Sequence, residues 1–531
     1  RIHSGFRTAT IFLVVLLIAY WASGKSTFHQ LENPGPWPEH NVPNTVLNFL
    51  LLLLIFWCSL LSGLTFFVDR FRIPPLVVLS LVFWLIAQPG GSDHFFYTFR
   101  RPANSQLLAP PQIFQDALDP VIVVAAAGGG IQSAAWTSRV LCGLRANFRP
   151  TTSNKTNDFE SHILVISGVS GGSVGTMFYL RCLETEEGDV SPADWAENSS
   201  LEAVAWGLTH PDLQRIFFPW SPESWRVADR GWALERALLK SAQFKNHERL
   251  VLTDDNLRRP VLLLNSSDAQ TGDPVVFTNS DFAYHPPDPT KPAKHDINNF
   301  RDTAGGDRDV FLETAVRMSA AFPYVSPEAR PDNLAAKNGV HLGDGGYFDN
   351  SGVFALSEWL KEAVKEHPSK KRILFLELDA FPDSANRDME TSKRWYYQVS
   401  SPLETMLNVR SEAQVVRDKS SGEDLQTMFN ESGFQTTWLL VRYEPPPSEK
   451  NNPYANNPPL SWHLTTIEQN SIKEAWSAVE AKVSEKISDF LNGPPTDLAA
   501  GACDPYGPIA NGVFQKRCAA APADPGENGS R

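Results

Sequence analysis

The chain has 531 residues, of which 60 are acidic and 47 are basic, so its formal net charge is −13. This balance argues against a nucleic-acid partner, because neutralising phosphates requires a concentrated basic surface. Five cysteines in a chain of this length exclude a disulfide scaffold. A charged fraction of 20% and an aromatic fraction of 11% exclude a chain that is disordered throughout or a coiled coil.

The first hundred residues contain three uncharged apolar runs, at 8–22, 46–68 and 73–87. The middle run would extend roughly 34 Å as a helix, which is enough to cross the hydrocarbon core of a bilayer. The outer runs are shorter and also fit buried core helices. We therefore predict that residues 1–100 form a membrane anchor with two or three transmembrane helices, which makes the chain an integral membrane protein.

The orientation of this anchor is not determined by its charges. In a three-span arrangement four basic residues lie on one side and three on the other: Arg1, Arg7, Arg70 and Arg72 against Lys25, Arg100 and Arg101. That difference is too small for the positive-inside rule to apply. If the rule did apply, the rest of the chain would lie outside the cytoplasm.

After residue 100 short β-branched runs alternate with helical segments. The clearest buried strands are predicted at Val121–Ala126 and Ile163–Ser167, and later ones at 261–265, 275–278, 373–378 and 437–442. This alternation predicts an α/β fold with a mostly parallel central sheet covered on both faces. We expect a catalytic domain over residues 101–490. Residues 491–531 are rich in Pro, Gly and Ala and are expected to form a flexible tail.

The most specific motif is Gly168-Val169-Ser170-Gly171-Gly172, directly after one predicted strand and directly before a helix. A nucleophile elbow requires such a turn, because the serine oxygen must project from a strained strand-to-helix connection. Gly168 and Gly172 would allow the close backbone approach of this turn. The position therefore indicates Ser170 as a candidate nucleophile.

A second glycine run, Gly128-Gly129-Gly130, also lies between a strand and a helix. Its amides can converge on one point and stabilise an oxyanion. The alternatives are an ordinary tight turn or a nucleotide-binding loop. The latter is disfavoured because the next strand does not end in an acidic residue and no Walker lysine is present.

A third motif, Asp344-Gly345-Gly346, would by itself indicate only an Asp-Gly turn. The order and spacing of all three motifs, however, resemble the patatin-like phospholipase family. Two further stretches fit the same resemblance, namely Asn265–Asp268 with the strand that follows, and the Ala315–Pro323 helix and turn. The resemblance covers about residues 119–380 and implies a patatin-like three-layer fold.

The resemblance implies a lipid acyl hydrolase of the phospholipase or lysophospholipase type, a serine carboxylic ester hydrolase that needs no cofactor. Carried over to this sequence, Ser170 is the nucleophile, Asp344 is the base of a Ser–Asp dyad, and Gly128, Gly129 and Gly130 supply the oxyanion hole. The chemistry would proceed through an acyl-enzyme. Membrane lipids would be the substrate, whereas protein partners are not indicated.

This chain departs from the family pattern around its first glycine run. Many members have Asp before the glycines and Arg-Gly after them, whereas Ala127, Gln132 and Ser133 occupy those places here. A neutral Gln132 leaves only the backbone amides to bind an anion. Gln132 is the one sequence feature that favours an alternative function, a non-catalytic membrane scaffold that keeps the fold. A second alternative is an α/β-hydrolase esterase with a Ser-His-Asp triad, for which His341 or His463 would be the histidine, although the placement of Asp344-Gly345-Gly346 argues against it. The sequence contains no HExxH motif and no comparable spacing of metal ligands, so it does not indicate a metal site.

Overall fold

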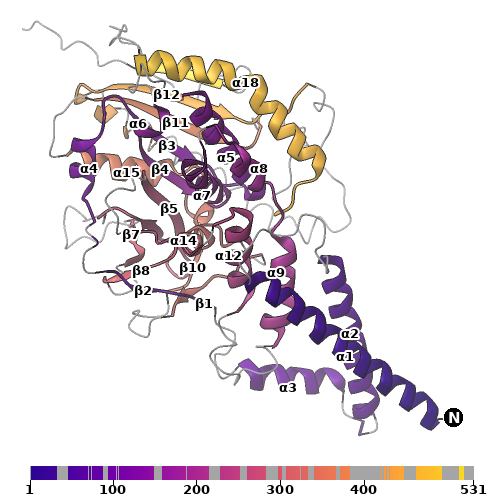
Figure 1. The fold of residues 1–531 in the computed structure, drawn as a ribbon. Coiled ribbons are helices and arrows are strands. Elements are labelled where there is room, and N and C mark those ends of the chain that lie inside the picture. The colour runs from indigo at the N-terminus through magenta and orange to yellow at the C-terminus, as the bar shows by residue number, and fades with distance from the viewer. Residues whose placement is uncertain are drawn as a thin grey trace, which may run out of the picture.

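The structure is a computed structural model, and the described part of the chain comprises residues 2–32, 46–69, 71–72, 74–87, 94–102, 105, 107–148, 158–186, 188–214, 228–244, 246–251, 260–282, 297–301, 306–322, 325–332, 340–365, 371–382, 420, 422, 424–425, 427–429, 431–447, 462–492 and 513–518. Figure 1 shows a large α/β body, from which the first three helices project.

The α/β body is built on one nine-stranded sheet with the order β13-β12-β11-β3-β4-β5-β6-β7, to which β10 adds by pairing with β5. The pairings among β12, β11, β3, β4 and β5 are parallel, as is that of β6 with β7. The predicted α/β class with a mostly parallel sheet is thus confirmed. The strands are β3 (Val121–Ala126), β4 (Ile163–Val169), β5 (Val261–Asp268), β6 (Pro274–Thr278), β7 (Asn298–Asn299), β10 (Leu342–Asp344), β11 (Arg372–Asp379), β12 (Gln435–Arg442) and β13 (Val513–Cys518).

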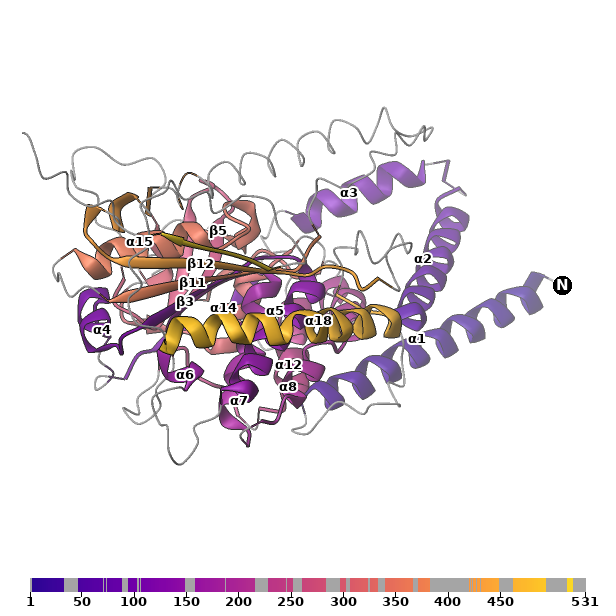
Figure 2. The ribbon, with the colours of Figure 1, turned by 90° about the horizontal axis from the view of Figure 1, so that it is seen from above.

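Helices cover both faces of the sheet because side chains of a strand point alternately to its two faces. In β3, Ile122 and Val124 belong to one apolar cluster, whereas Val121, Val123 and Ala125 belong to the other. The first cluster packs beneath α5 (Gly130–Asn147), α7 (Gly171–Glu184), α14 (Leu312–Ser319) and α18 (Thr466–Asn492), and the second beneath α4 (Pro110–Asp116) and α15 (Val353–Val364). Figure 2 shows the resulting three layers from above.

Shorter elements connect these layers. They are β1 (Phe95–Phe96), β2 (Phe99–Arg100), α6 (Phe159–His162), α8 (Ser191–Trp195), α9 (Leu201–Gly207), the π-helix η1 (Leu208–Asp212), α12 (Arg230–Ser241), β8 (Arg308–Asp309), β9 (Arg330–Pro331) and the 3-10 helix η3 (Gly345–Tyr347). Strand β13 lies in the segment for which composition predicts a tail, and it pairs antiparallel with β12 at the edge of the sheet.

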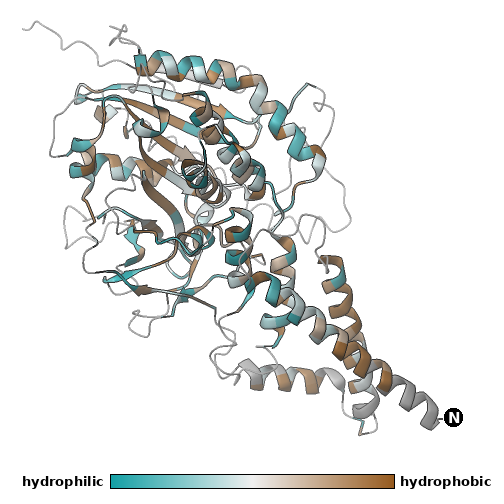
Figure 3. Ribbon diagram, in the orientation of Figure 1, coloured by the Kyte–Doolittle hydropathy of each residue, from teal (hydrophilic) through white to brown (hydrophobic). Residues whose placement is uncertain are grey.

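The three apolar runs of the sequence lie in helices α1 (Ile2–Glu32), α2 (Val46–Asp69) and α3 (Pro75–Ala87). Among the described residues, the stretch Val46–Thr65 is long and apolar enough to cross a membrane. Figure 3 shows α2 as predominantly hydrophobic where it projects from the body. Large apolar side chains are exposed along these helices: Ile11, Phe12, Val15, Ile18, Leu50, Leu54, Leu61, Leu81 and Leu85 are among them.

One end of this helical group is docked on the α/β body. Leu31 of α1 and Phe49 of α2 are buried in a cluster with Trp206 of α9 and alanines of α9 and α12. The Trp206 indole donates a hydrogen bond to the Gly24 carbonyl at 2.9 Å. The His210 ring stacks on Tyr20 with centroids 4.2 Å apart. Burial lowers the pKa of His210, which favours the neutral ring in this stack.

Candidate active site

Ser170 occupies the turn between strand β4 and helix α7. Its backbone has φ 49° and ψ −118°, a conformation that a residue with a side chain adopts only when its surroundings enforce it. The glycine after it is required by packing, because a β-carbon on Gly171 would lie 1.9 Å from the Gly130 carbonyl oxygen. A β-carbon on Gly172 would similarly lie 2.3 Å from the Ala126 oxygen. The strained serine and close-packed glycines are the geometry of a nucleophile elbow.

The register of the sheet brings Asp344 to this serine from 174 positions further along the chain. Val169 at the end of β4 pairs with Asn265 of β5, and the next residue of β5, Ser266, pairs with Asp344 of β10. The Ser170 hydroxyl donates to Asp344 Oδ2 at 2.8 Å. Both side chains are buried, with exposed fractions of 6% for Ser170 and 4% for Asp344.

The Asp344 carboxylate is oriented by the glycines that follow it. Its Oδ1 accepts the Gly346 amide at 2.7 Å, which leaves Oδ2 directed at the serine. A β-carbon on Gly345 would lie 2.2 Å from the Asn265 oxygen, so this turn presses directly against β5. The DGG motif thus provides both an amide donor and the close approach that places the carboxylate.

The Gly128–Gly130 run lies beside the elbow because β3 and β4 are neighbours and Ala126 pairs with Gly168. The Gly128 amide donates to the Asn350 carbonyl at 2.8 Å, so this hydrogen bond occupies one of the three predicted oxyanion donors. No partner within the described residues accepts the Gly129 amide or the Gly130 amide. Gly129 has φ 151°, and a β-carbon there would lie 2.2 Å from the Phe381 ring.

Two supporting residues were not singled out as site residues from the sequence. The Ser170 amide donates to Ser319 Oγ at 3.2 Å, and that hydroxyl also bonds Ser173 Oγ at 2.7 Å. Asn265 Nδ2 donates to the Gly168 carbonyl at 2.9 Å. Ser319 ends α14 and Asn265 belongs to β5, so both hold the elbow from outside it. Their only sequence signal is their place in the two further stretches that resemble the family.

The surroundings of Gln132 and of the Ser170 hydroxyl bear on the two alternative functions. Gln132 is buried on the first turn of α5, with an exposed fraction of 2%, and its Nε2 has no partner among the described residues. The Ser170 hydroxyl is bonded to the Asp344 carboxylate, and to none of the described histidines. His341 precedes β10, and its carbonyl accepts the Ala269 amide at 2.8 Å.

A half-buried carboxylic acid, Glu377, lies on β11 one strand away from the glycine loop. Burial raises the pKa of Glu377 to about 7, against the hydrogen bond from the Trp438 indole at 3.0 Å. Among the described residues no group of three or more His, Cys, Asp or Glu side chains is arranged to hold a metal ion.

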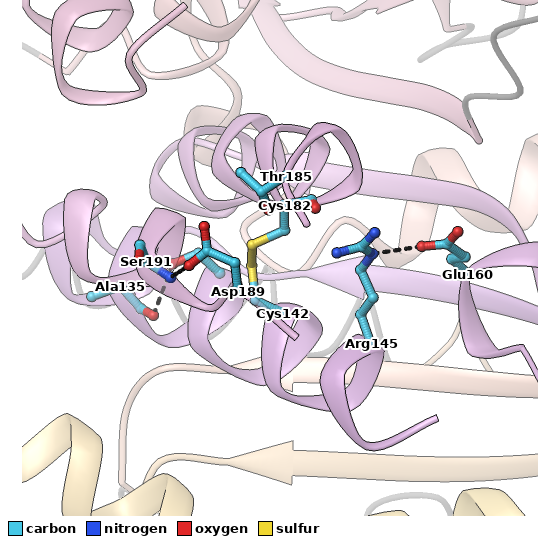
Figure 4. Close-up of a disulfide and its surroundings, with 9 residues drawn as sticks. Ala135, Cys142, Arg145, Glu160, Cys182, Thr185, Asp189 and Ser191 are labelled. Carbon is cyan, nitrogen blue, oxygen red and sulfur yellow. Dashed lines mark hydrogen bonds and ion pairs between the residues drawn. A yellow bond between two sulfur atoms is a disulfide. The ribbon is translucent and has the colours of Figure 1, made fainter. Parts of the chain in front are cut away.

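A disulfide links the two helices that begin at the site. Cys142 of α5 and Cys182 of α7 are bonded, with Cα atoms 6.0 Å apart. Figure 4 shows the bond bridging neighbouring helices, with the Arg145–Glu160 ion pair nearby. Sequence reasoning did not pair these residues, since 40 positions separate them. The sequence also allows Cys503 to pair with Cys518, but Cys503 and the Cys518 side chain lie outside the described residues.

Comparison with models of known protein families agrees with this geometry, as the match below shows. No curated protein matches the chain. Residues 124–357 match the family model for patatin-like phospholipase. That range contains the glycine loop, the elbow serine, the two supporting stretches and the DGG aspartate. Residues 124–357 of the chain therefore form a patatin-like phospholipase domain.

Proposed function

We propose that this lipid acyl hydrolase cleaves carboxylic esters of membrane lipids with a Ser170–Asp344 dyad, through an acyl-enzyme. The observation that carries the proposal is the direct 2.8 Å hydrogen bond between the serine hydroxyl and the carboxylate, both of them buried. An acid and an alcohol in such contact can exchange the proton that the alcohol must lose to become a nucleophile.

In the first half-reaction, Ser170 Oγ attacks the ester carbonyl carbon while its proton passes to Asp344 Oδ2. Collapse of the tetrahedral intermediate breaks the bond to the leaving alcohol, which takes that proton from the carboxylic acid. In the second half-reaction, a water molecule gives its proton to Asp344 and attacks the acyl-serine. The fatty acid leaves, and the proton returns to Ser170.

The negative charge of each tetrahedral intermediate requires preorganised donors. We assign this role to the amides of Gly129 and Gly130, which have no partner among the described residues. Gly128 supports them, because its own amide is held by Asn350. Helix α5 begins at Gly130, so the positive end of its dipole faces the same point. The Phe381 ring beside Gly129 offers an apolar contact for an acyl chain.

The helices α1, α2 and α3 are proposed to anchor the catalytic domain in a membrane. Their exposed apolar side chains would contact lipid, and the stretch Val46–Thr65 has the length of a span. An anchor holds the active site near its insoluble substrate, which raises the effective substrate concentration.

The test uses the purified full chain and two substitutions that preserve shape, Ser170→Ala and Asp344→Asn. Each is expected to reduce kcat for a chromogenic ester and for a phospholipid by at least about 1000-fold, since each removes one member of a unit that acts together. A fluorophosphonate probe should label the unsubstituted chain at Ser170 and leave Ser170→Ala unlabelled. His341→Ala is the matched control and should keep its activity. Full activity of folded Ser170→Ala would refute the dyad.

A further inference from the structure

The contacts of α1 and α2 show which end of the anchor carries the catalytic domain, and therefore which basic residues lie beside it. Tyr20 and Gly24, in the second half of α1, contact Thr209 and Trp206 of the domain. Phe49, near the start of α2, stacks edge-on against His210. Helix α1 therefore ends at the domain and helix α2 begins there. The opposite ends of both helices point away from the sheet in both views (Figures 1 and 2).

The basic residues of the anchor region can now be sorted by position. Arg7 lies in the first turns of α1, and Arg72 lies in the turn after α2, so both are at the end away from the domain. Arg100 lies in β2, which pairs with β8 of the domain, and it faces Asp307 at 3.4 Å. Lys25 lies over the Trp21 ring on the docked half of α1.

These positions increase the excess of basic residues at the end of the anchor that lies away from the domain. Arg100 and Arg101 no longer count as residues that flank a span, because Arg100 belongs to a strand of the domain and the Arg101 amide donates to the Asp307 carbonyl at 2.8 Å. Lys25 alone then remains on the domain side. The end away from the domain holds Arg7 and Arg72, with Arg1 and Arg70 close to them in sequence. Basic residues that flank spans are enriched on the cytoplasmic side. The domain would then lie on the opposite side.

The Cys142–Cys182 disulfide points to the same side independently of charge. Both cysteines are buried, at 2% and 0% exposure, between two helices of the catalytic core. Structural disulfides persist in oxidising compartments, whereas cytosolic thiols are kept reduced. Cys58 in the apolar helix α2 is the free cysteine among the described residues.

We propose that the catalytic domain lies on the oxidising, non-cytoplasmic side of its membrane and takes its acyl esters from that side. The proposal rests on the proposed membrane anchor and specifies the substrate pool of the proposed active site. Helices α5 and α7 begin at Gly130 and Gly171, the two glycines in backbone contact at the site. The disulfide that joins these helices therefore also holds the oxyanion loop against the elbow.

The first test labels single cysteines in intact cells. The background carries Cys58→Ser, Cys503→Ser and Cys518→Ser, which leaves the buried disulfide in place. The Lys365→Cys variant reports on the domain, where this side chain is 68% exposed, and Phe71→Cys reports on the turn after α2, where Phe71 is 69% exposed. A membrane-impermeant maleimide should label Lys365→Cys before lysis at least tenfold more than Phe71→Cys, and both equally after lysis. Labelling of Phe71→Cys alone before lysis, or equal labelling, would overturn the proposal.

The second test detects the disulfide in the native protein. Free thiols are blocked at the moment of lysis, and the chain is digested without reductant for mass spectrometry. A peptide linked through Cys142 and Cys182 is expected, and alkylated Cys142 and Cys182 would contradict the oxidising location. The Cys142→Ser, Cys182→Ser double variant should have a lower Tm than the control Cys58→Ser. A reductant should lower the Tm of the control toward that of the double variant.

These readouts separate this proposal from the proposed chemistry. Neither maleimide labelling nor peptide mapping requires turnover, so inactive Ser170→Ala should give the same labelling pattern as the active chain. A domain found on the cytoplasmic side would leave the dyad standing. Loss of the dyad in the activity test would in turn leave the orientation standing.

Discussion

The hydroxyl of Ser319 gives a sharp prediction about how the nucleophile is held. It accepts the Ser170 amide at 3.2 Å and bonds Ser173 Oγ at 2.7 Å, and it is fully buried. Ser319→Ala leaves the Ser170 amide buried without an acceptor, which costs about 1–3 kcal/mol. A residue in a sparsely populated backbone conformation carries a strain of similar size, about 1–3 kcal/mol, and relaxes when its surroundings no longer enforce it.

We therefore expect the free energy of unfolding to fall by about 1–3 kcal/mol in Ser319→Ala. Relaxation of Ser170 would move its Oγ from Asp344, so kcat should fall roughly 10- to 100-fold, since about 1.4 kcal/mol of lost transition-state stabilisation is tenfold in rate. The KM should change little, because Ser319 touches the elbow and not the ester.

The assay combines steady-state hydrolysis of a short-chain ester, the rate of fluorophosphonate labelling and urea unfolding. Ser326→Ala is the matched control, because Ser326 is also buried and its Oγ has no partner among the described residues. That variant should keep both stability and kcat. If folded Ser319→Ala keeps its kcat and labelling rate within twofold of the unsubstituted chain, Ser319 does not position the nucleophile.

Three further predictions concern close packing, pH and the anchor contact. Gly171→Ala would bring a β-carbon to 1.9 Å from the Gly130 oxygen and should abolish ester hydrolysis, whereas Gly63→Ala, which meets nothing within 4 Å, should leave it unchanged. Burial raises the pKa of Glu377 to about 7 from 4.5, so the folded chain keeps a proton that the unfolded chain releases between these values. The free energy of unfolding should therefore fall as pH rises through this window, by no more than about 3 kcal/mol. Urea unfolding at pH 4.5 and 7.5 should show this loss in the unsubstituted chain and not in Glu377→Gln. An equal loss in the variant would contradict the assignment of the effect to Glu377. Trp206→Phe removes the 2.9 Å hydrogen bond to the Gly24 carbonyl and should weaken the docking of α1 by about 1 kcal/mol. The measurement is amide hydrogen exchange, which should become faster at the end of α1 and stay unchanged in α15, the internal reference.

Much of this structure could be predicted from the sequence because several of the sequence patterns are local. The β-branched run Val121–Ala126 forms a strand at its predicted bounds, and the glycine-flanked Ser170 follows a strand and precedes a helix. Such features depend on residues a few positions apart, whose steric and apolar preferences act whatever the rest of the chain does. The α/β class followed from their alternation.

Other features depended on which strands become neighbours. The pairing of β10 with β5 brings Asp344 to Ser170, and the contact of α14 with the elbow brings Ser319 to the Ser170 amide. The bond from Gly128 to Asn350, the Cys142–Cys182 disulfide and the docking of α1 on α9 are likewise contacts between distant segments. The sequence by itself determined the local elements and, through motif order, the candidate chemistry. Only the tertiary structure decided the partners of these residues and the end of the anchor that bears the domain, because strand register and helix packing are set by the whole chain folding around one core.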